Sequence, residues 1–289
     1  EHRMDINLYS PAGLRRLLGE ESAAPLKKFG QNFLINPAVV ERMIAESGLT
    51  GADGVLEIGP GPGALTSRLV PAARRVVAIE IDRKMVAVLK TTAPGAEVLE
   101  ADIMRLDLAA LIAEKFADCE RVLVFGNLPY YITSPLLMLL IEQELPIASV
   151  TAMVQKEAAA RLCAREGSRE SGAVTLAVRY RSRPRILFDV SRGSFYPVPG
   201  VDSSVIQLVP FRRAERPVSE EKLFRLIRAA FAGRRKTLAN SVSAGLALDK
   251  SAVTKALTVC GIAPAARAET LGVEQYIALT NCLCGRGIL

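Results

Sequence analysis

The 289-residue sequence has no tryptophan and a single histidine, His2. Histidine is the usual general base near neutral pH and a frequent zinc ligand. We therefore expect neither a Ser-His-Asp triad nor a histidine-bearing zinc site, and we expect no metal. The chemistry of this protein needs no imidazole.

Cysteines and long apolar runs are also scarce. The five cysteines form no Cys-x-x-Cys pair, and their odd number predicts reduced thiols in a cytoplasmic protein. We expect them to be buried as small hydrophobic side chains. The densest apolar run, residues 135–141, is far shorter than the roughly 20 residues of a membrane span. The first residues are charged and do not resemble a signal peptide. We expect a protein without membrane contact.

Charge is the first positive feature. The formal net charge is +7 and the pI is near 9.3, which favours a polyanionic partner. A basic surface that is merely solvated remains the alternative, so charge alone does not identify the partner.

Residues 37–210 alternate short apolar runs with amphipathic segments. Several runs are apolar on both faces, which indicates a mostly parallel sheet covered by helices on both sides, a Rossmann-like α/β fold. The predicted strands are residues 55–58, 76–79, 96–99, 122–125 and 150–154, with helices at 64–70, 84–90 and 135–143. A ligand is then expected at the carboxyl edge of the sheet.

The pattern changes near residue 211, where a charged linker ends at Pro217. Ser219 is placed to cap a helix that begins with Glu220 and Glu221. Everything that follows reads as helix, at 223–232, 237–247, 251–260 and 273–282. We predict a first domain over residues 1–211 and a smaller all-helical domain over residues 212–289.

A glycine-rich turn follows the first of these strands. Gly59, Gly61 and Gly63 let the backbone approach a ligand closely, and the helix that follows offers unpaired N–H groups. The third glycine comes one residue too early for the dinucleotide pattern, and Glu57 before the turn would repel a phosphate. The turn therefore favours a ligand that carries a cation and a ribose.

Acidic residues end the next two strands. Glu80 is placed to bind ribose hydroxyls, and Asp102 is placed to accept a hydrogen bond from an exocyclic amine. Either acid alone would usually be a surface or capping residue. Together with Gly59, the two acids predict S-adenosylmethionine, which has the sulfonium, the ribose and the adenine amine to match.

The fourth strand ends in Asn127, Leu128, Pro129 and Tyr130. The Asn127 amide oxygen and the Leu128 carbonyl could both accept from a substrate amine and aim its lone pair at the methyl group. Pro129 fixes the turn, and Tyr130 could stack on the base that carries the amine. Such a displacement needs positioning more than a strong base.

Six sequence blocks in this order resemble the bacterial 16S ribosomal RNA adenine-N6 dimethyltransferases. They are residues 27–34, 57–66, 127–130, 155–157, 194–203 and 231–238, and the resemblance covers nearly the whole chain after about residue 10. It implies transfer of two methyl groups from S-adenosylmethionine to N6 of each of two adjacent adenosines near the 3′ end of 16S RNA. It also implies action on a small-subunit (30S) assembly intermediate, and we expect a monomer.

The resemblance adds residues to the expected site. Asn32 and Leu34 would join Gly59, Gly61, Gly63, Glu80, Asp102 and Asn127 around the donor. Asn127, Leu128 and Tyr130 would face a flipped adenine, and Phe195 would stack on its other face. Tyr196 stands where some relatives carry a small residue, so either aromatic ring could stack, and Phe195 is preferred.

Two further interpretations stay open. A relative that acts on 23S RNA or on DNA adenines would share the donor pocket, and an assembly factor of the same shape would bind the subunit without needing its chemistry. Lys27, Lys28 and residues 234–236 are candidate phosphate contacts, and the sequence leaves undecided whether residues 179–185 form a strand or a helix.

Overall fold

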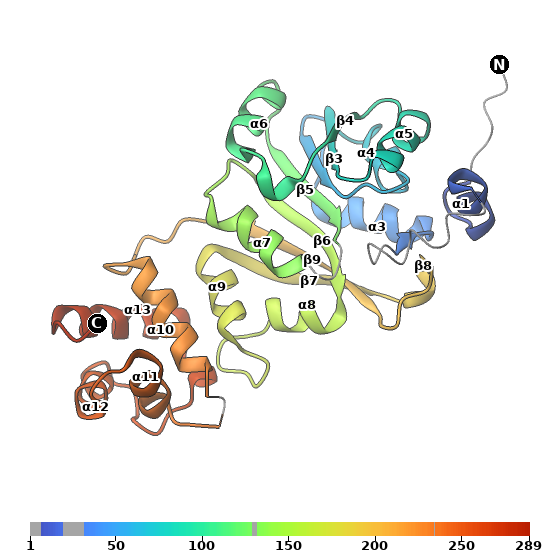
Figure 1. The fold of residues 1–289 in the computed structure, drawn as a ribbon. Coiled ribbons are helices and arrows are strands. Elements are labelled where there is room, and N and C mark those ends of the chain that lie inside the picture. The colour runs from blue at the N-terminus through green and yellow to red at the C-terminus, as the bar shows by residue number, and fades with distance from the viewer. Residues whose placement is uncertain (1–6, 20–31, 129–131, 234) are drawn as a thin grey trace, which may run out of the picture. The chain divides into compact units, whose positions relative to one another are not determined.

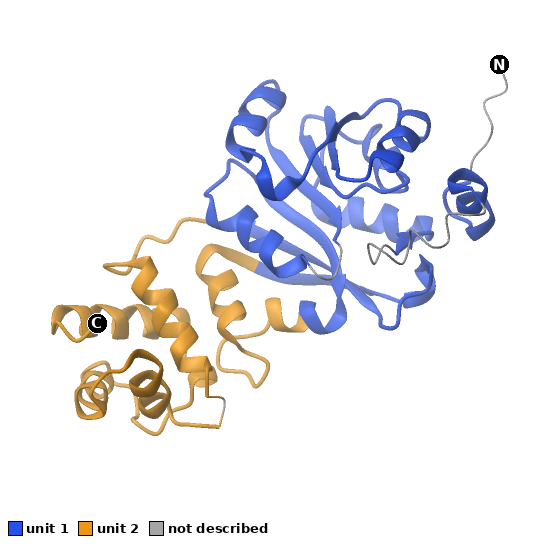
Figure 2. Ribbon diagram, viewed as in Figure 1, with its two compact units in different colours: residues 1–159, 184–210 blue, residues 160–183, 211–289 orange. Residues whose placement is uncertain are grey.

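The computed structural model describes residues 7–19, 32–128, 132–233 and 235–289, which divide into two compact units (Figure 2). Unit 1 contains residues 1–159 and 184–210, and unit 2 contains residues 160–183 and 211–289. The sequence-based division after residue 211 lies one residue from one of these crossings. It did not separate residues 160–183 from the sheet-containing domain.

Unit 1 is built on a seven-stranded sheet in the order β4-β3-β2-β5-β6-β9-β7 (Figure 1). The strands are β2 (Gly54–Ile58), β3 (Arg75–Glu80), β4 (Glu97–Glu100), β5 (Val122–Asn127), β6 (Ser149–Gln155), β7 (Ser182–Val190) and β9 (Ser203–Pro210). The pairs from β4 to β6 are all parallel, whereas β6 and β9 are antiparallel. The expected mostly parallel sheet is confirmed.

The inner strands β2, β3, β5 and β6 form where the sequence is apolar on both faces, because helices cover them. Every residue of β2 is buried, and Val55, Leu123 and Phe125 belong to one hydrophobic core of this unit. The helices are α1 (Pro11–Leu18), α3 (Pro37–Ser47), α4 (Thr66–Leu69), α5 (Arg83–Thr92), α6 (Leu108–Lys115), α7 (Thr133–Glu142) and α8 (Lys156–Leu162), which ends in unit 2. Helices α4 and α5 pack against β3, and α3 packs against α4.

Unit 2 is helical. Its helices are α9 (Ala173–Arg181), α10 (Glu220–Phe231), α11 (Leu238–Leu246), α12 (Lys250–Val259) and α13 (Val273–Gly285). The Ser219 hydroxyl caps α10 by accepting from Lys222 N at 3.3 Å, as its place in the sequence predicts. Leu176 and Tyr180 of α9 are buried in the same core as Leu226 and Tyr276, which is why α9 belongs to this unit.

The arginine-rich segment whose form the sequence left open is divided between two elements. Arg179 and Arg181 lie in the last turn of α9, and Arg183 and Arg185 lie in β7. The strand and helix signals were therefore both real, but for different parts of the segment. None of the helices in the described ranges is both long and apolar enough to cross a membrane.

The cysteines depart from expectation in one respect. All five are free thiols, and all five are only half-buried, so they are not the buried hydrophobic residues that the sequence predicted. The described part of the chain contains no group of three or more His, Cys, Asp or Glu side chains arranged to hold a metal ion.

Candidate donor and acceptor site

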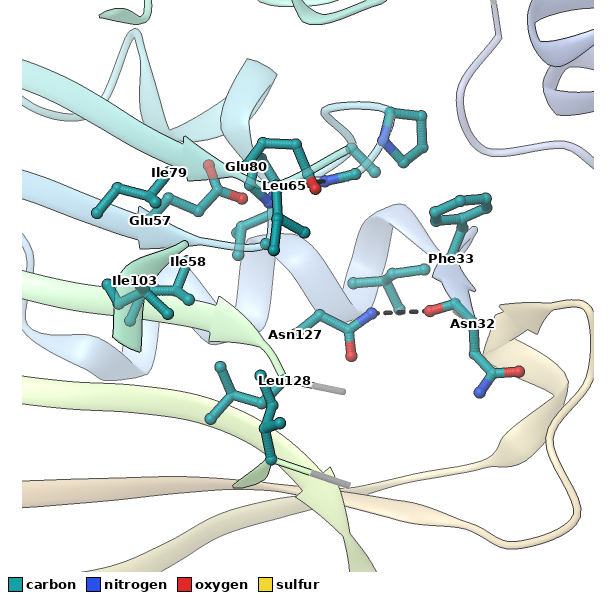
Figure 3. A pocket seen from close by; sticks show the side chains of 18 of the residues that line it. Asn32, Phe33, Glu57, Ile58, Leu65, Ile79, Glu80, Ile103, Asn127 and Leu128 are labelled. Atoms are coloured by element: carbon teal, nitrogen blue, oxygen red, sulfur yellow. Dashed lines mark hydrogen bonds between the residues drawn. The ribbon is translucent and has the colours of Figure 1, made fainter. Parts of the chain in front are cut away.

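A cavity of about 280 Å³ lies at the carboxyl ends of β2, β3, β4 and β5 (Figure 3). The chain runs outward from β2 to β4 and then returns to β5 on the other side of β2, so the cavity occupies the topological switch point of the sheet. The sequence-predicted residues that line it are Asn32, Leu34, Gly59, Gly61, Glu80, Asp102, Asn127 and Leu128.

Two predicted residues lie elsewhere. Gly63 is not among the lining residues, and a Cβ there would come within 2.8 Å of Thr92 Oγ1 and 3.0 Å of Leu89, so this glycine permits close packing on α5. Phe195 is 1% exposed in the core and does not line the cavity. Pro129 and Tyr130 lie outside the described residues.

The glycine turn carries a backbone donor into the cavity wall. Gly61 has φ +55°, which side-chain-bearing residues rarely adopt, and its N–H donates to Glu80 Oε2 at 3.1 Å. A Cβ at Gly61 would also approach the Phe33 ring to 3.1 Å. The turn, β3 and the N-terminal segment are therefore fitted together at this point.

Glu80 is held from both sides by backbone. Its Oε1 accepts from Asp82 N at 2.9 Å while Oε2 accepts from Gly61, and the residue is 3% exposed. Burial raises the pKa of Glu80 above its ordinary value, and these hydrogen bonds oppose the shift. A carboxyl fixed in this way keeps lone pairs for hydroxyl groups of a ligand.

Asp102 serves two purposes at the end of β4. Its Oδ1 caps the short helix η2 (Ile103–Arg105) by accepting from Met104 N at 3.0 Å. Its Oδ2 lies 3.5 Å from Arg105 Nε, and the side chain is 35% exposed. The capping interpretation is therefore correct for Asp102, and the same side chain lines the cavity.

Asn127 is oriented by a contact that the sequence did not reveal. Its Nδ2 donates to the backbone carbonyl of Asn32 at 2.9 Å (Figure 3). Within the described ranges no group donates to the other end of the amide, Oδ1. The amide therefore presents an acceptor oxygen at the cavity rather than a donor nitrogen.

Asn32 directly precedes a strand of a two-stranded sheet. Strand β1 (Phe33–Leu34) pairs antiparallel with β8 (Phe195–Tyr196), with Leu34 opposite Phe195. Tyr196 is half-buried, and its hydroxyl accepts from Arg15 Nη1 at 3.3 Å. Of the two adjacent aromatic residues, Tyr196 is thus the more exposed.

The cavity is acidic. Glu57, Glu80 and Asp102 line it, and no lysine, arginine or histidine is found among the described lining residues. Such an environment attracts a cation and repels phosphate. From the sequence, Glu57 indicates only that phosphate is disfavoured. The burial of Glu57 could not be predicted, because it depends on the strands to either side of it.

Comparisons with known proteins agree with this geometry. The family model described as Ribosomal RNA adenine dimethylase matches residues 25–284. The chain belongs to this family. Among curated relatives, a Ribosomal RNA small subunit methyltransferase A from Geobacillus thermodenitrificans is 38% identical, covering 97% of this chain and 98% of the relative. The protein of that name from Bacillus mycoides is 39% identical over 89% of this chain and 90% of its own.

Solved structures of family-like enzymes share the fold. A dimethyladenosine transferase from Plasmodium falciparum superposes with a TM-score of 0.71 at 26% identity, covering 88% of this chain and 98% of its own. The 23S rRNA methyltransferase ErmE superposes with a TM-score of 0.64 at 27% identity, covering 88% of this chain and all of its own. The Rossmann-like methyltransferase fold expected from the sequence is confirmed.

Proposed function

We propose that this family member transfers methyl groups from S-adenosylmethionine to N6 of two adjacent adenosines near the 3′ end of 16S rRNA. It is an rRNA adenine dimethyltransferase, and S-adenosylmethionine is the donor. The relatives at 38% and 39% identity are small-subunit enzymes by name, which favours 16S over 23S RNA. The single observation that carries the chemistry is the orientation of the Asn127 amide.

The cavity residues fit the donor along the sheet. Asp102 follows β4, Glu80 ends β3 and Asn127 ends β5, with β2 between the last two. We assign Asp102 to the adenine amine and Glu80 to the ribose hydroxyls, with the turn at Gly59 and Gly61 against the rest of the donor. This order leaves the methyl group near Asn127.

The donor supplies a methyl group made electrophilic by the sulfonium charge. Asn127 Oδ1 accepts one hydrogen of the target amine, because Nδ2 is already committed to Asn32. The Leu128 carbonyl accepts the second, so the nitrogen lone pair stays out of conjugation with the ring. The amine loses its proton after the bond to carbon forms, and no strong base is required.

An aromatic sandwich is assigned to the extruded adenine. Tyr130 supplies one face, and a ring from the Phe195–Tyr196 pair supplies the other, offsetting an unstacking cost of a few kcal/mol. Phe195 would have to leave the core to do so. Tyr196 therefore has the more accessible ring.

The RNA contact is assigned to the helical region 212–289, which makes up most of unit 2. Its sequence carries 13 Lys and Arg against 6 Asp and Glu, a formal charge of +7, whereas residues 1–211 carry 24 of each. Contacts between Lys or Arg side chains and backbone phosphates supply much of the affinity of proteins for nucleic acids. We propose that this region contacts a 30S assembly intermediate in the cytoplasm and that the protein acts as a monomer.

The test uses labelled donor and unmethylated 30S particles. The unaltered protein should label N6 of 16S adenines. Asn127→Ala should lose transfer by about 100-fold or more while still binding donor, since misplacement of a reacting group has effects of this size. Gln143→Ala, which removes an exposed amide at the end of α7, should behave like the unaltered protein.

The outcomes separate the alternatives. Label on 23S RNA alone would move the assignment toward the ErmE-like activity. Absence of label with intact 30S binding would favour an assembly factor without catalysis.

A further inference from the structure

Glu57 is a buried carboxyl group in the wall of the cavity, with no ionic partner among the described residues. It is the second-to-last residue of β2, is 1% exposed, and lines the cavity. Among the described residues, no group donates a hydrogen bond to its Oε2. A buried carboxylate with no partner is costly, so this group needs either a proton or a cation.

The surroundings of Glu57 supply no cation. Glu80 of β3 is the acidic neighbour, and Asp102 lines the same cavity beyond it. On the other side Glu57 lies opposite Phe125 of β5, and Thr66 of α4 contributes only a hydroxyl. Glu57 and Glu80 appear side by side in Figure 3. No residue of these elements neutralises the carboxylate.

Burial raises the pKa of Glu57 to about 8, with the charge of Glu80 adding to the shift and Thr66 opposing it. The empty cavity therefore holds Glu57 mostly in its protonated form at neutral pH. A positive charge that enters the cavity reverses this preference, because opposite charges close together favour the ionised carboxyl.

The strand order places that positive charge. Strand β2 lies between β3, which carries Glu80, and β5, which carries Asn127. A donor whose ribose meets Glu80 and whose methyl group meets Asn127 crosses the end of β2 with its sulfonium. This step rests on the proposed function.

We propose that Glu57 determines specificity for the charged donor over its demethylated product: it loses a proton to solvent when S-adenosylmethionine binds and regains one when the sulfonium charge is gone. In the transfer itself the amine lone pair forms the new C–N bond, the C–S electron pair goes to sulfur, and the amine proton leaves. The product has the same amino and carboxylate groups as the donor but a neutral sulfur. The product, without the sulfonium charge, gains less from an ionised Glu57 than the donor does, and this difference favours release of the product.

The test is isothermal titration of donor and product into the full-length protein, in buffers of different ionisation enthalpy at about pH 7. With a carboxyl pKa of about 8, donor binding should release the larger part of one proton. Product binding should release clearly fewer. Donor affinity should rise by about tenfold per pH unit between about pH 6 and 7.5, because the free group must lose its proton.

Variants identify the group responsible. Glu57→Gln should abolish the difference in proton release and reduce the ratio of donor to product affinity. Glu142→Gln, which removes an exposed acid at the end of α7, should preserve both. If Glu57→Gln fails to fold, the comparison of proton release by donor and product in the unaltered protein is the test.

Equal proton release by donor and product would overturn the inference, as would a difference that persists in Glu57→Gln. Methyl transfer to adenine would then still stand, because it is measured separately. Donor that does not bind at all would overturn both this inference and the proposed donor site.

Discussion

Substituting Gly126 by alanine should displace Asn127 and Leu128, which are assigned to the target amine, with little effect on the rest of the donor pocket. Gly126 precedes Asn127 in β5 and lies opposite Ile58 of β2. A Cβ at this position would come within 2.6 Å of Leu128 Cδ2 and 2.9 Å of the Ile58 carbonyl oxygen. Both distances are well below van der Waals contact, and the second neighbour is backbone.

Relieving the clash with the new Cβ requires the Leu128 side chain to move. Leu128 is 2% exposed and lines the cavity, so a displacement of its side chain changes the shape of the cavity beside Asn127. Overpacking of this kind costs about 1–3 kcal/mol in stability. The backbone that carries Asn127 and Leu128 shifts with the side chain, and a displacement near 1 Å at a reacting group costs about 100-fold in rate.

The assay combines urea unfolding, donor titration and single-turnover methyl transfer. Gly126→Ala should lose about 1–3 kcal/mol and most of its transfer rate, whereas donor affinity should change much less. Gly172→Ala is the matched control, because a Cβ there meets nothing within 4 Å. Gly126→Ala that matches Gly172→Ala in both stability and rate would refute the reasoning.

Three further predictions concern the rest of the molecule. Asp53 is fully buried, and although burial raises its pKa, hydrogen bonds from Arg121 and Thr50 outweigh this and lower it. Arg121→Met should therefore cost about 2 kcal/mol in urea unfolding at pH 7, and progressively less as the pH falls from the ordinary carboxyl pKa through the lowered pKa, below which Asp53 is protonated in the folded protein as well. Ser219→Ala should lower the stability of the protein by about 1 kcal/mol in the same assay, because α10 loses its cap. Replacing the exposed Arg235 and Lys236 by glutamine should weaken RNA binding and reduce its salt slope by about 1 per lost phosphate contact; an unchanged slope would mean that neither residue touches phosphate.

Regular patterns made much of the sheet predictable. The five predicted strands correspond to β2 to β6. Four of them are short apolar runs bounded by turn residues, whereas the edge strand β4 has only Val98 and Leu99 between two glutamates. Strands β7 and β9 were not predicted, and β9 runs antiparallel to β6. The sequence of β7 contains two arginines and a proline, and its place in the sheet depends on β9.

The acidic half of the site was predictable for a related reason. Parallel strands deliver their carboxyl ends to one edge, so Glu80 and Asp102 had to meet there once the strands were identified. The contact that orients Asn127 leaves no such pattern, because its partner is a backbone carbonyl 95 residues away. The burial of Phe195 likewise depends on its pairing with Leu34.

The domain division shows the same limit. The charged linker near residue 211 is visible in the sequence, but the burial of α9 in the helical unit is not. Leu176 and Tyr180 are spaced like any helix face, and only their contacts with residues such as Leu226 and Tyr276 reveal which core they join.

A crystal structure of the protein with S-adenosylmethionine bound is the most direct test of the central claim, that four strand ends form one donor pocket beside the Asn127 amide. The account predicts hydrogen bonds from the ribose to Glu80 and from the adenine amine to Asp102. It also predicts the methyl group near Asn127 Oδ1, with Nδ2 still bonded to Asn32. A donor bound outside this cavity, or an Asn127 amide turned away from the methyl group, would contradict it.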